Sequence, residues 1–355
     1  MAPDRTGTAS VPRHDVTTGT PPRRAVMADV AAQAGVSVMT VSRVLNGFAG
    51  VTEETRLRVE EAVLALGYQA NTAARVLAGG RSRTLGVMAV ETEQFGPSHM
   101  LFGIEAAARE AGHLLSFVTL GRSGNDMAST LHRLRASHVQ GVIVVAPVKR
   151  VVEAVTRLDG DMPLVVVGGD PAIGTPTVTI DQFEGARLAT RHLLDLGHRT
   201  VHHVAGPQSW IDATARMRGW SEALRTYPAQ RGISVAGDWG AGKGYDAGTR
   251  LARDPAVTAI FAANDQTALG VIRGLHDAGR RVPEDVSVVG FDETPESGYF
   301  LPPLTTIRQD FGEVGRRSVE LLLSLADGDP ARRHVVVPAA LVIRASTAPP
   351  PEGSG

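Results

Sequence analysis

The sequence predicts a small all-α helix-turn-helix headpiece followed by a two-lobed α/β domain. Residues 25–68 show short helical apolar patterns that are broken by glycines. After residue 83, short runs of apolar, β-branched residues alternate with amphipathic helical stretches, which is typical of doubly wound parallel sheets. About 265 residues of this alternation are too many for one such sheet, so we expect two lobes.

The composition excludes several classes of protein. The chain has 355 residues, a net charge of −1 and no cysteine, which excludes disulfides, thiolate metal sites and cysteine nucleophiles. No apolar run reaches the ~18 residues that span a bilayer. The first 24 residues contain no apolar segment of the kind found in secretory signals. We therefore expect a cytoplasmic globular protein that does not contact a membrane.

The charge is unevenly distributed along the chain. Residues 1–83 contain ten Arg against seven Asp and Glu, a net charge of +3, which leaves −4 for the remainder. A basic bias at one end marks the place to look for a nucleic-acid-binding module. Residues 1–24 are rich in Pro, Thr, Gly and Arg and predict a disordered arm, and residues 349–355 predict a disordered tail.

Residues 29–47, DVAAQAGVSVMTVSRVLNG, have the spacing of a helix-turn-helix. Small Ala31 lets two helices approach closely, and Gly35 can adopt the left-handed conformation of the turn. Ser37 is placed to cap the second helix. A third helix, capped by Thr52 and closed by Gly67, completes a DNA-binding domain that we expect over residues 25–70.

The second helix of this motif has one inward and one outward face. Its inward stripe consists of Val41, Val44 and Leu45. On the outward face, Arg43 can bind guanine bidentately in a major groove, apolar side chains suit thymine methyl groups, and polar side chains can bind phosphates. A three-helix bundle that binds a protein, or nothing, is the alternative. The residues that we expect to contact DNA here are Ser37, Val38, Met39, Ser42, Arg43 and Asn46.

Residues 25–83 resemble the headpiece of the LacI/GalR family of bacterial repressors, whose hallmark is close to DVA, AGVS and TVSRVLNG of this segment. In that family the segment that matches Asn71–Gly80 is a hinge helix that folds on operator DNA. A leucine that matches Leu77 inserts there into the minor groove. The resemblance therefore implies a hinge helix over residues 71–82 and a minor-groove contact by Leu77, which is otherwise a linker residue. Such a wedge costs unstacking energy and gains contact with bent DNA.

Six apolar runs and four amphipathic stretches define the expected elements of the large domain. The runs that predict strands are 85–90, 114–120, 141–146, 164–168, 259–263 and 286–291. The stretches that predict helices are Gly103–Ala111, Ala128–Ser137, Gly185–Leu196 and Gln266–Ala278. In open α/β sheets, ligands bind beyond the carboxyl ends of the strands. The polar residues expected there are Glu91, Asp170, Asn264, Asp265 and Asp292.

From Val178 to Thr347 the chain again resembles the LacI/GalR family, in segments that include ANDQTALG at 263–270 and VSVVGFDET at 286–294. Residues 84–180 resemble it only in pattern. The family core is similar to type I periplasmic sugar-binding proteins. The resemblance therefore implies that residues 83–348 form a two-lobed, type I periplasmic-binding-protein-like domain that binds an effector and dimerises.

The resemblance also implies a set of effector-binding residues. Arg216, Asn264 and Asp292 match family residues that hydrogen-bond ligand hydroxyls. Trp239 matches an aromatic residue against which a sugar-binding member packs its ligand, and Gln309 and Phe311 match pocket-lining residues. Carboxylate, amide, guanidinium and indole groups together suit a sugar.

Two of these residues have plainer alternatives, because Asn264 can serve only as a helix cap and Trp239 only as a core residue. The wording of the first lobe departs from the family pattern at GPSHM, residues 96–100. Phe95 is the candidate contact from that lobe.

Other signals do not support an enzyme. Residues 237–243 fit the phosphate-loop pattern GxxxxGK, but Gly244 stands where a Ser or Thr should bind Mg²⁺. His202 and His203 point to opposite sides of an expected strand, so they do not predict a metal site with His198. No nucleophile–base motif is present. We therefore expect no cofactor, no metal and no catalytic residues.

The sequence thus predicts a repressor that binds a pseudo-palindromic operator as a homodimer and is released by a galactoside or a glucoside. Tetrameric members of the LacI/GalR family carry a leucine heptad after the core, whereas this chain ends in TAPPPEGSG, so the resemblance implies a dimer. Two alternatives remain. One is a regulator whose corepressor is a purine or a partner protein, and the other is a solute-binding protein of the same fold.

Overall fold

The computed structural model describes ten segments and divides into two compact units, Met1–Gly80 and Arg81–Gly355. The described residues are 25–45, 48, 50–68, 82–90, 93–121, 126–155, 162–168, 174–228, 232–329 and 334–352. Five sequence predictions lie outside them: the arm at 1–24, most of the hinge segment, Asn46, Leu77, and the polar positions Glu91 and Asp170. The boundary between the units falls within the segment 71–82, where the hinge is expected.

The described residues of the first unit form three helices. They are α1 (Met27–Ala34), α2 (Val38–Leu45) and α3 (Glu53–Ala65). Their core contains Val30, Val41 and Val59, which are fully buried. The predicted turn and caps are confirmed: Gly35 has φ of 65°, the Ser37 hydroxyl accepts from the backbone N–H of Thr40 at 3.1 Å, and the side chain of Thr52 caps α3.

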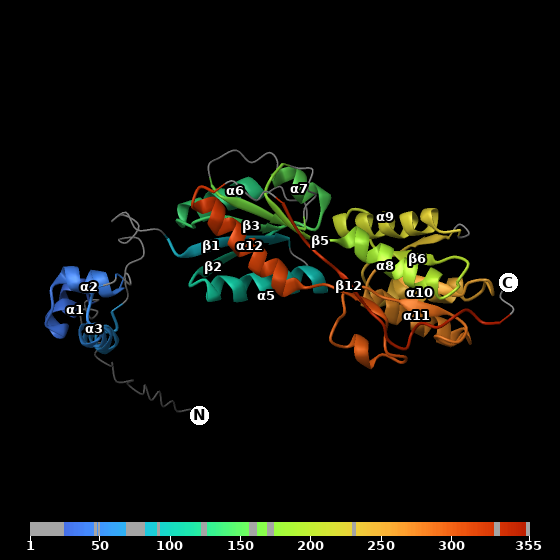
Figure 1. Cartoon of the computed structure of the whole chain (residues 1–355). Coiled ribbons are helices and arrows are strands. Elements are labelled where there is room, and N and C mark those ends of the chain that lie inside the picture. Colours follow the sequence, from blue (N-terminus) through green and yellow to red (C-terminus); the bar gives the residue numbers. More distant parts are fainter. Residues whose placement is uncertain are drawn as a thin grey trace, which may run out of the picture. The chain divides into compact units, whose positions relative to one another are not determined.

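The second unit contains two α/β lobes (Figure 1). Lobe one is a parallel sheet of six strands in the order β11-β5-β4-β3-β1-β2. Its strands are β1 (Thr84–Val90), β2 (Leu114–Leu120), β3 (Val142–Val145), β4 (Leu164–Val167), β5 (Thr177–Ile180) and β11 (His334–Val337). Helices α5 (Phe95–Glu110) and α12 (Phe311–Ala326) cover one face, and α6 (Met127–Ala136) and α7 (Lys149–Val155) cover the other.

Lobe two is a parallel sheet of four strands in the order β7-β6-β8-β9. Its strands are β6 (His202–Ala205), β7 (Ser234–Ala236), β8 (Ala259–Ala262) and β9 (Ser287–Val289). Helices α8 (Gln182–Asp195) and α9 (Ile211–Thr226) cover one face, and α10 (Ala241–Leu251) and α11 (Asp265–Asp277) cover the other. The antiparallel pair β10 (Thr306–Arg308) and β12 (Ala340–Val342) and the short helix η2 (Ser297–Tyr299) complete this lobe.

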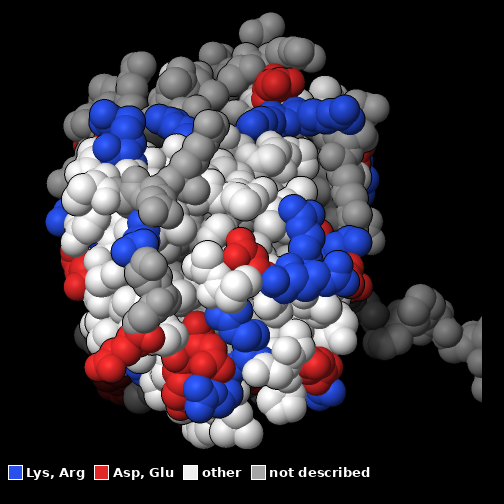
Figure 2. Space-filling view, turned by 90° about the vertical axis from the view of Figure 1, so that its right-hand side faces the viewer, with Lys and Arg blue, Asp and Glu red and all other residues white. Residues whose placement is uncertain are grey.

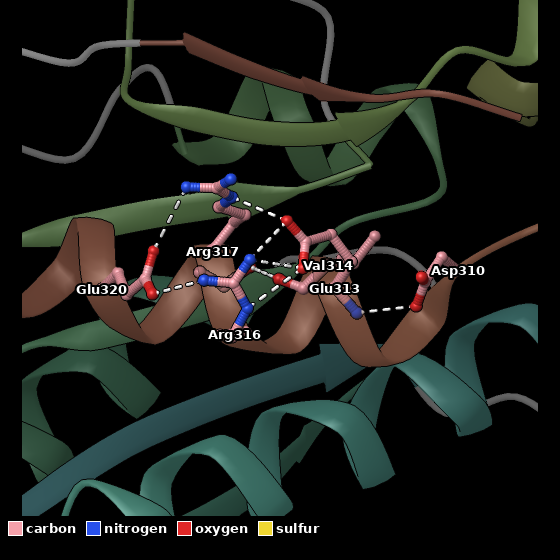
Figure 3. A network of polar contacts seen from close by, with 7 residues as sticks. Asp310, Glu313, Val314, Arg316, Arg317 and Glu320 are labelled. Carbon is pink, nitrogen blue, oxygen red and sulfur yellow. Dashed lines mark hydrogen bonds and ion pairs between the residues drawn. The ribbon is translucent and has the colours of Figure 1, made fainter.

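The chain crosses between the lobes three times: from β5 to α8, from β10 to α12, and from β11 to β12. The second crossing ends where the Asp310 side chain accepts from the backbone N–H of Glu313 at 2.8 Å and so caps α12. The Glu313 carboxylate in turn accepts from Arg316 and Arg317, and Arg316 also pairs with Glu320 (Figure 3). These partly exposed pairs stabilise the helix only modestly.

Charged side chains of both signs occur together on the end of the molecule seen in Figure 2, and no single field of positive charge covers that face. Ion pairs such as Arg273 with Asp277 and Arg281 with Asp285 belong to lobe two. This mixture of signs agrees with the net charge of −4 that residues 84–355 carry, against +3 for residues 1–83.

The predicted strands and helices of the large domain are confirmed, with one correction. The helix expected over Gly103–Ala111 begins eight residues earlier, at Phe95. Pro97 lies in its first turn, where the backbone N–H groups have no helical partner, so a proline does not interrupt the helix there. This earlier start brings Phe95 and the GPSHM segment to the end of lobe one that faces lobe two.

Glycines allow pairs of helices to pack very closely, and Gly270 and Gly315 are two examples. A Cβ atom on Gly270 of α11 would lie 1.9 Å from the carbonyl oxygen of Ala241 in α10, and one on Gly315 of α12 would lie 2.1 Å from the carbonyl carbon of Gly103 in α5. Real Cβ atoms do not approach other atoms so closely, so an added methyl group must push the helices apart.

We predict that Gly270→Ala lowers the free energy of unfolding of the large domain by roughly 1–3 kcal/mol, because α10 and α11 must separate. Gly242→Ala is the matched control: Gly242 is also helical, but a Cβ there has nothing within 4 Å. That substitution should leave stability unchanged or raise it by up to ~1 kcal/mol. Urea unfolding measures both, and equal midpoints for the two variants would contradict the packing account.

Candidate functional site

The outward face of α2 carries the side chains that the sequence predicts for DNA contact. Val38 and Met39 are 47% and 71% exposed, and Ser37 and Arg43 are also exposed. The guanidinium group of Arg43 has no hydrogen bond or ion pair within the described residues. Ser42 is half-buried. On the opposite side Val44 and Leu45 pack against the headpiece core, so the helix is amphipathic in the expected sense.

A narrow cavity lies between the two lobes of the large domain. Its volume is about 20 Å³, close to that of one water molecule. Six of the seven predicted effector residues line it, and Phe311 lies next to it with its ring 5.8 Å from that of Phe95. The lining residues are Gln94, Phe95, Gly96, Pro97, Met100, Trp210, Asp212, Arg216, Trp239, Asn264, Asp292 and Gln309. We call this cavity the inner pocket.

A second and larger cavity adjoins the inner pocket. Its volume is about 760 Å³, and it shares Gln94, Trp210 and Trp239 with the inner pocket. The rings of Trp210 and Trp239 meet edge to face, with their centroids 5.4 Å apart. Lys149 and Arg150 of lobe one and Asp238 of lobe two also line it. We call it the outer cavity.

A ring of four buried polar side chains forms one wall of the inner pocket. Arg216 donates from Nε to the side-chain oxygen Oε1 of Gln182 at 2.8 Å, and from NH2 toward Asp292 Oδ1 at 3.4 Å. Gln182 Nε2 donates to Gln309 Oε1 at 2.7 Å. Gln309 Nε2 donates to Asp292 Oδ1 at 2.6 Å and closes the ring. The expected contact between Asp292 and Arg216 is therefore present, and buried charge is compensated there.

Gln182 is a member of this ring that sequence reasoning missed. It is 6% exposed and is the first residue of α8, directly after the Asp181 cap and the first crossing between the lobes. A polar residue just beyond the end of β5 was the available signal, because ligands in such folds bind past the carboxyl ends of strands. No expected strand covered Thr177–Ile180, so this position was not considered.

Burial governs the electrostatics of Asp292. It raises the pKa of this carboxyl group to about 7, although the charge of Arg216 lowers it. The neighbouring carboxylates of Asp265 and Asp212 raise it further. The backbone is strained here, with φ of 113° at Asp292 and 54° at Glu293. Arg344 donates to the Glu293 carboxylate at 2.8 Å and helps to hold this conformation.

Asn264 is a helix cap and Trp239 is a core residue, and both also line the inner pocket. Asn264 Oδ1 accepts from the backbone N–H of Thr267 at 2.9 Å and caps α11, and its Nδ2 donates to the Trp239 carbonyl at 3.1 Å. Both residues line the inner pocket and are also well buried. The indole Nε1 of Trp239 is buried and has no hydrogen-bond partner within the described residues. It is a donor available to a ligand in the cleft.

The two lobes are joined beside the cavities by a short backbone clasp. Val148 of lobe one pairs with Trp210 of lobe two in an antiparallel bridge. The Lys149 N–H donates to the Ser209 carbonyl at 3.2 Å, and the Ile211 N–H donates to the Pro147 carbonyl at 2.9 Å. Trp210 directly precedes α9, which carries Asp212 and Arg216, so this clasp connects lobe one to the wall of the inner pocket.

The remaining sequence signals have structural explanations. Gly244 lies against the carbonyl of Thr267 in α11, where a Cβ would approach to 2.2 Å, and Lys243 faces Asp246 at 3.5 Å. The Nδ1 atom of His203 hydrogen-bonds the Phe261 carbonyl, and the imidazole ring stacks on the ring of Phe261. Its Nε2 atom has no hydrogen-bond partner within the described residues. Within the described residues there is no cluster of three potential metal ligands and no helix long and apolar enough to cross a bilayer.

These features define a class of protein in which a helix-turn-helix module is joined to a two-lobed α/β domain with a ligand-sized cleft. Residues 26–71 match the bacterial regulatory proteins of the lacI family, and residues 190–347 match the periplasmic binding protein-like domain. The chain belongs to the LacI family, and it is a DNA-binding transcriptional regulator rather than an enzyme.

Relatives along almost the whole chain support this assignment. The lactose operon repressor of Escherichia coli (strain K12) is 35% identical over 325 residues, which are 91% of this chain and 90% of the repressor. The transcriptional regulator CelR of Thermobifida fusca is 35% identical over 342 residues, 91% and 98% of the two chains. The transcriptional repressor PurR of Vibrio cholerae serotype O1 (strain M66-2) is 31% identical over 319 residues, 87% and 94% of the two chains.

Solved structures agree with the fold. The lac repressor dimer bound to operator and the anti-inducer ONPF matches with a TM-score of 0.80 and 34% identity, covering 92% of this chain and all of that one. A complex of CelR with cellobiose matches with a TM-score of 0.67 and 32% identity, covering 91% of this chain and all of that one.

The pKa of Asp292 generates a prediction about stability. The carboxyl titrates near 7 in the folded chain and near 3.8 when unfolded, so the folded state binds more protons between these values. The contribution of Asp292 to the free energy of unfolding therefore falls as the pH rises from about 4 to about 7. In Asp292→Asn this titration is absent.

We expect the free energy of unfolding of the parent, minus that of Asp292→Asn, to decrease by roughly 2–4 kcal/mol across this pH window. Urea unfolding at several pH values measures the difference, in which the titration of groups that do not interact with Asp292 cancels. A difference that stays constant between pH 4 and pH 7 would contradict the raised pKa.

Proposed function

We propose that this chain is a repressor that binds operator DNA as a homodimer and is released by a small sugar bound between its lobes. The ring of Arg216, Gln182, Gln309 and Asp292 carries the sugar assignment. It presents both donors and acceptors to the inner pocket, and Asp292 retains a second carboxylate oxygen, Oδ2, without a partner among the described residues. Such a set matches the vicinal hydroxyls of a pyranose.

The two adjoining cavities favour a disaccharide or another glycoside over a single sugar ring. The inner pocket supplies the polar ring, and the edge-to-face pair Trp210 and Trp239 separates it from the outer cavity of about 760 Å³. An indole face covers the apolar C–H side of a pyranose well. The structure of CelR contains cellobiose, and that of the lac repressor contains ONPF, so a galactoside or a glucoside is the class to test first.

Sugar binding would act by shifting a population of lobe arrangements. The inner pocket is close to the volume of one water molecule, so a sugar ring can enter only when the two lobes change their separation. Because the clasp at Val148 and Trp210 and the three crossings also join the lobes, this change would reach the amino-terminal end of lobe one. There the hinge segment 71–82 would lose its DNA-bound arrangement, and the repressor would dissociate.

We further propose that the outward face of α2 contacts base edges and phosphates in a major groove through Ser37, Val38, Met39, Ser42 and Arg43, together with Asn46. Leu77 of the hinge segment would insert into the minor groove. The exposed side chains on α2 support the first part. Two such headpieces would bind the half-sites of a pseudo-palindrome.

Exposed apolar side chains support the homodimer. Leu114 and Phe117 of the edge strand β2 are 73% and 51% exposed, and Phe102 of α5 is 69% exposed. Large apolar side chains exposed at a sheet edge are typical of an interface. An operator-binding repressor acts on the chromosome, so the proposed location of this dimer is the cytoplasm.

Fluorescence anisotropy of a labelled duplex from the upstream region of the gene tests the proposal. The full chain is bound to the duplex and titrated with galactosides, β-glucosides and purines. Release by one glycoside supports the proposed function. Tight binding that no glycoside weakens would contradict the sugar assignment and leave the DNA-binding regulator in place.

Arg43 should discriminate between bases. We predict that Arg43→Ala lowers the ratio of specific to non-specific DNA affinity by about 10- to 100-fold, because one bidentate guanine contact contributes roughly 1–3 kcal/mol. Arg58→Ala is the matched control, since Arg58 is also an exposed cation of the headpiece but lies on α3. It should weaken both kinds of binding equally or not at all. Equal losses for the two variants would remove Arg43 from base recognition.

Asp292 should be needed for release and not for operator binding. We predict that Asp292→Asn binds the operator within twofold of the parent and no longer responds to the inducing glycoside, because the amide places an NH2 donor where the carboxylate offers the acceptor Oδ2 to a sugar hydroxyl. The anisotropy titration provides both values in one experiment. Full release of Asp292→Asn at the parent's sugar concentration would exclude this carboxylate from the sugar site.

A purine corepressor is the second candidate. The PurR relatives and the aromatic walls of the cavities, Phe95, Trp210 and Trp239, favour it, because aromatic rings also stack on purines. The sign of the effect separates the two functions. A purine corepressor would tighten operator binding in the same anisotropy titration, whereas an inducing glycoside would weaken it.

A further inference from the structure

Asp212 is a carboxylate of the inner pocket that the ring of four side chains does not use. It lies in the first turn of α9, four residues before Arg216, and lines the inner pocket. Its carboxylate has no hydrogen bond or ion pair within the described residues. Burial raises the pKa of this group, and the charge of Arg216 lowers it. Carboxylates in such surroundings are normally paired.

Asp212 has no ion-pair partner of its own in the inner pocket. Two of the carboxylates that line it, those of Asp212 and Asp292, face one cation, Arg216. Arg216 already donates to Gln182, to the Ala263 carbonyl and toward Asp292. Lys149 lines the outer cavity and, together with Arg218 and Asp212, a further cavity of about 450 Å³, but neither cation forms an ion pair with Asp212. A ligand that brings one positive charge to the inner pocket would pair with Asp212, whereas a neutral ligand would leave this carboxylate without an ion pair.

The walls around Asp212 are suited to such a ligand. Phe95, Trp210 and Trp239 line the same pocket, and the faces of aromatic rings attract cations. Trp239 is 7% exposed, and its buried Nε1 has no hydrogen-bond partner within the described residues. This N–H group is a donor that needs an acceptor. The pocket thus offers an anionic site for an ammonium group and a donor for a hydroxyl or ring oxygen.

We propose that the effector is an amino sugar and that Asp212 selects it by binding its protonated amine. This inference rests on the proposed function, because it assumes that the cleft binds a sugar. It narrows the class of ligand from glycosides in general to those with a free amine on the ring in the inner pocket. Asp212 is then a specificity-determining residue, and the ring of four side chains orients the hydroxyl groups.

Isothermal titration calorimetry of the full chain with matched disaccharides tests this proposal. Cellobiose, the β-1,4-linked disaccharide of glucosamine, and its N-acetylated form differ only in a hydroxyl, a free amine or a neutral amide. Lactose and lactosamine form a second pair with a galactose ring. We expect the free amine to bind at least tenfold more tightly than the matching neutral sugar at pH 6.5.

Asp212→Asn identifies the residue responsible. We expect this variant to lose at least tenfold in affinity for the amine and to bind the neutral sugar within twofold of the parent. Asp238→Asn is the matched control, because Asp238 is a carboxylate of the outer cavity, and it should retain the preference. Unchanged operator binding shows that each variant is folded.

Each other outcome is decisive. Equal or tighter binding of the neutral sugars to the parent would overturn the amino-sugar proposal and leave the proposed function intact. A preference for the amine that survives in Asp212→Asn would overturn the role of Asp212. Failure of every disaccharide of both series to bind the parent would count against the proposed sugar function itself, and the amino-sugar proposal would fall with it.

Discussion

The hydrogen-bonded ring of Arg216, Gln182, Gln309 and Asp292 is the interaction on which the large domain depends. Gln182 follows the first crossing between the lobes, and Gln309 lies on the second, between β10 and α12. The ring therefore ties two of the three connecting segments to a buried ion pair. A buried charge pair is tolerated only when its geometry and hydrogen bonds are nearly complete, so these four side chains constrain one another and the crossings.

This arrangement connects ligand chemistry to lobe geometry. Any group that binds Asp292 or Arg216 also acts on the side chains at the crossings, and the clasp between Val148 and Trp210 lies at the other side of the same pocket. The positive φ angles at Asp292 and Glu293 show that the chain holds this carboxylate in an unfavourable backbone conformation. Strain of this kind persists where the surrounding structure and the function require it.

Sequence patterns predicted much of this structure, for physical reasons that are easy to name. The turn at Gly35 and the caps at Ser37 and Thr52 are local, and so are the apolar runs that became β1, β2 and β3. The early start of α5 was missed because Pro97 is normally a sign that a helix ends. Gln182 and the unpaired state of Asp212 were missed because they depend on which residues meet across the cleft, and spacing along the chain does not contain that information.

In the proposed mechanism, sugar and operator bind to different sites through one coupled equilibrium, and each weakens the binding of the other. The affinity of the inducing glycoside, measured through the intrinsic fluorescence of the tryptophans, should be compared for the free protein and for the protein saturated with operator duplex. Thermodynamic linkage requires that operator weakens sugar binding by the same factor by which sugar weakens operator binding. We predict equal factors above tenfold. The same sugar affinity in the presence and absence of operator would contradict the account.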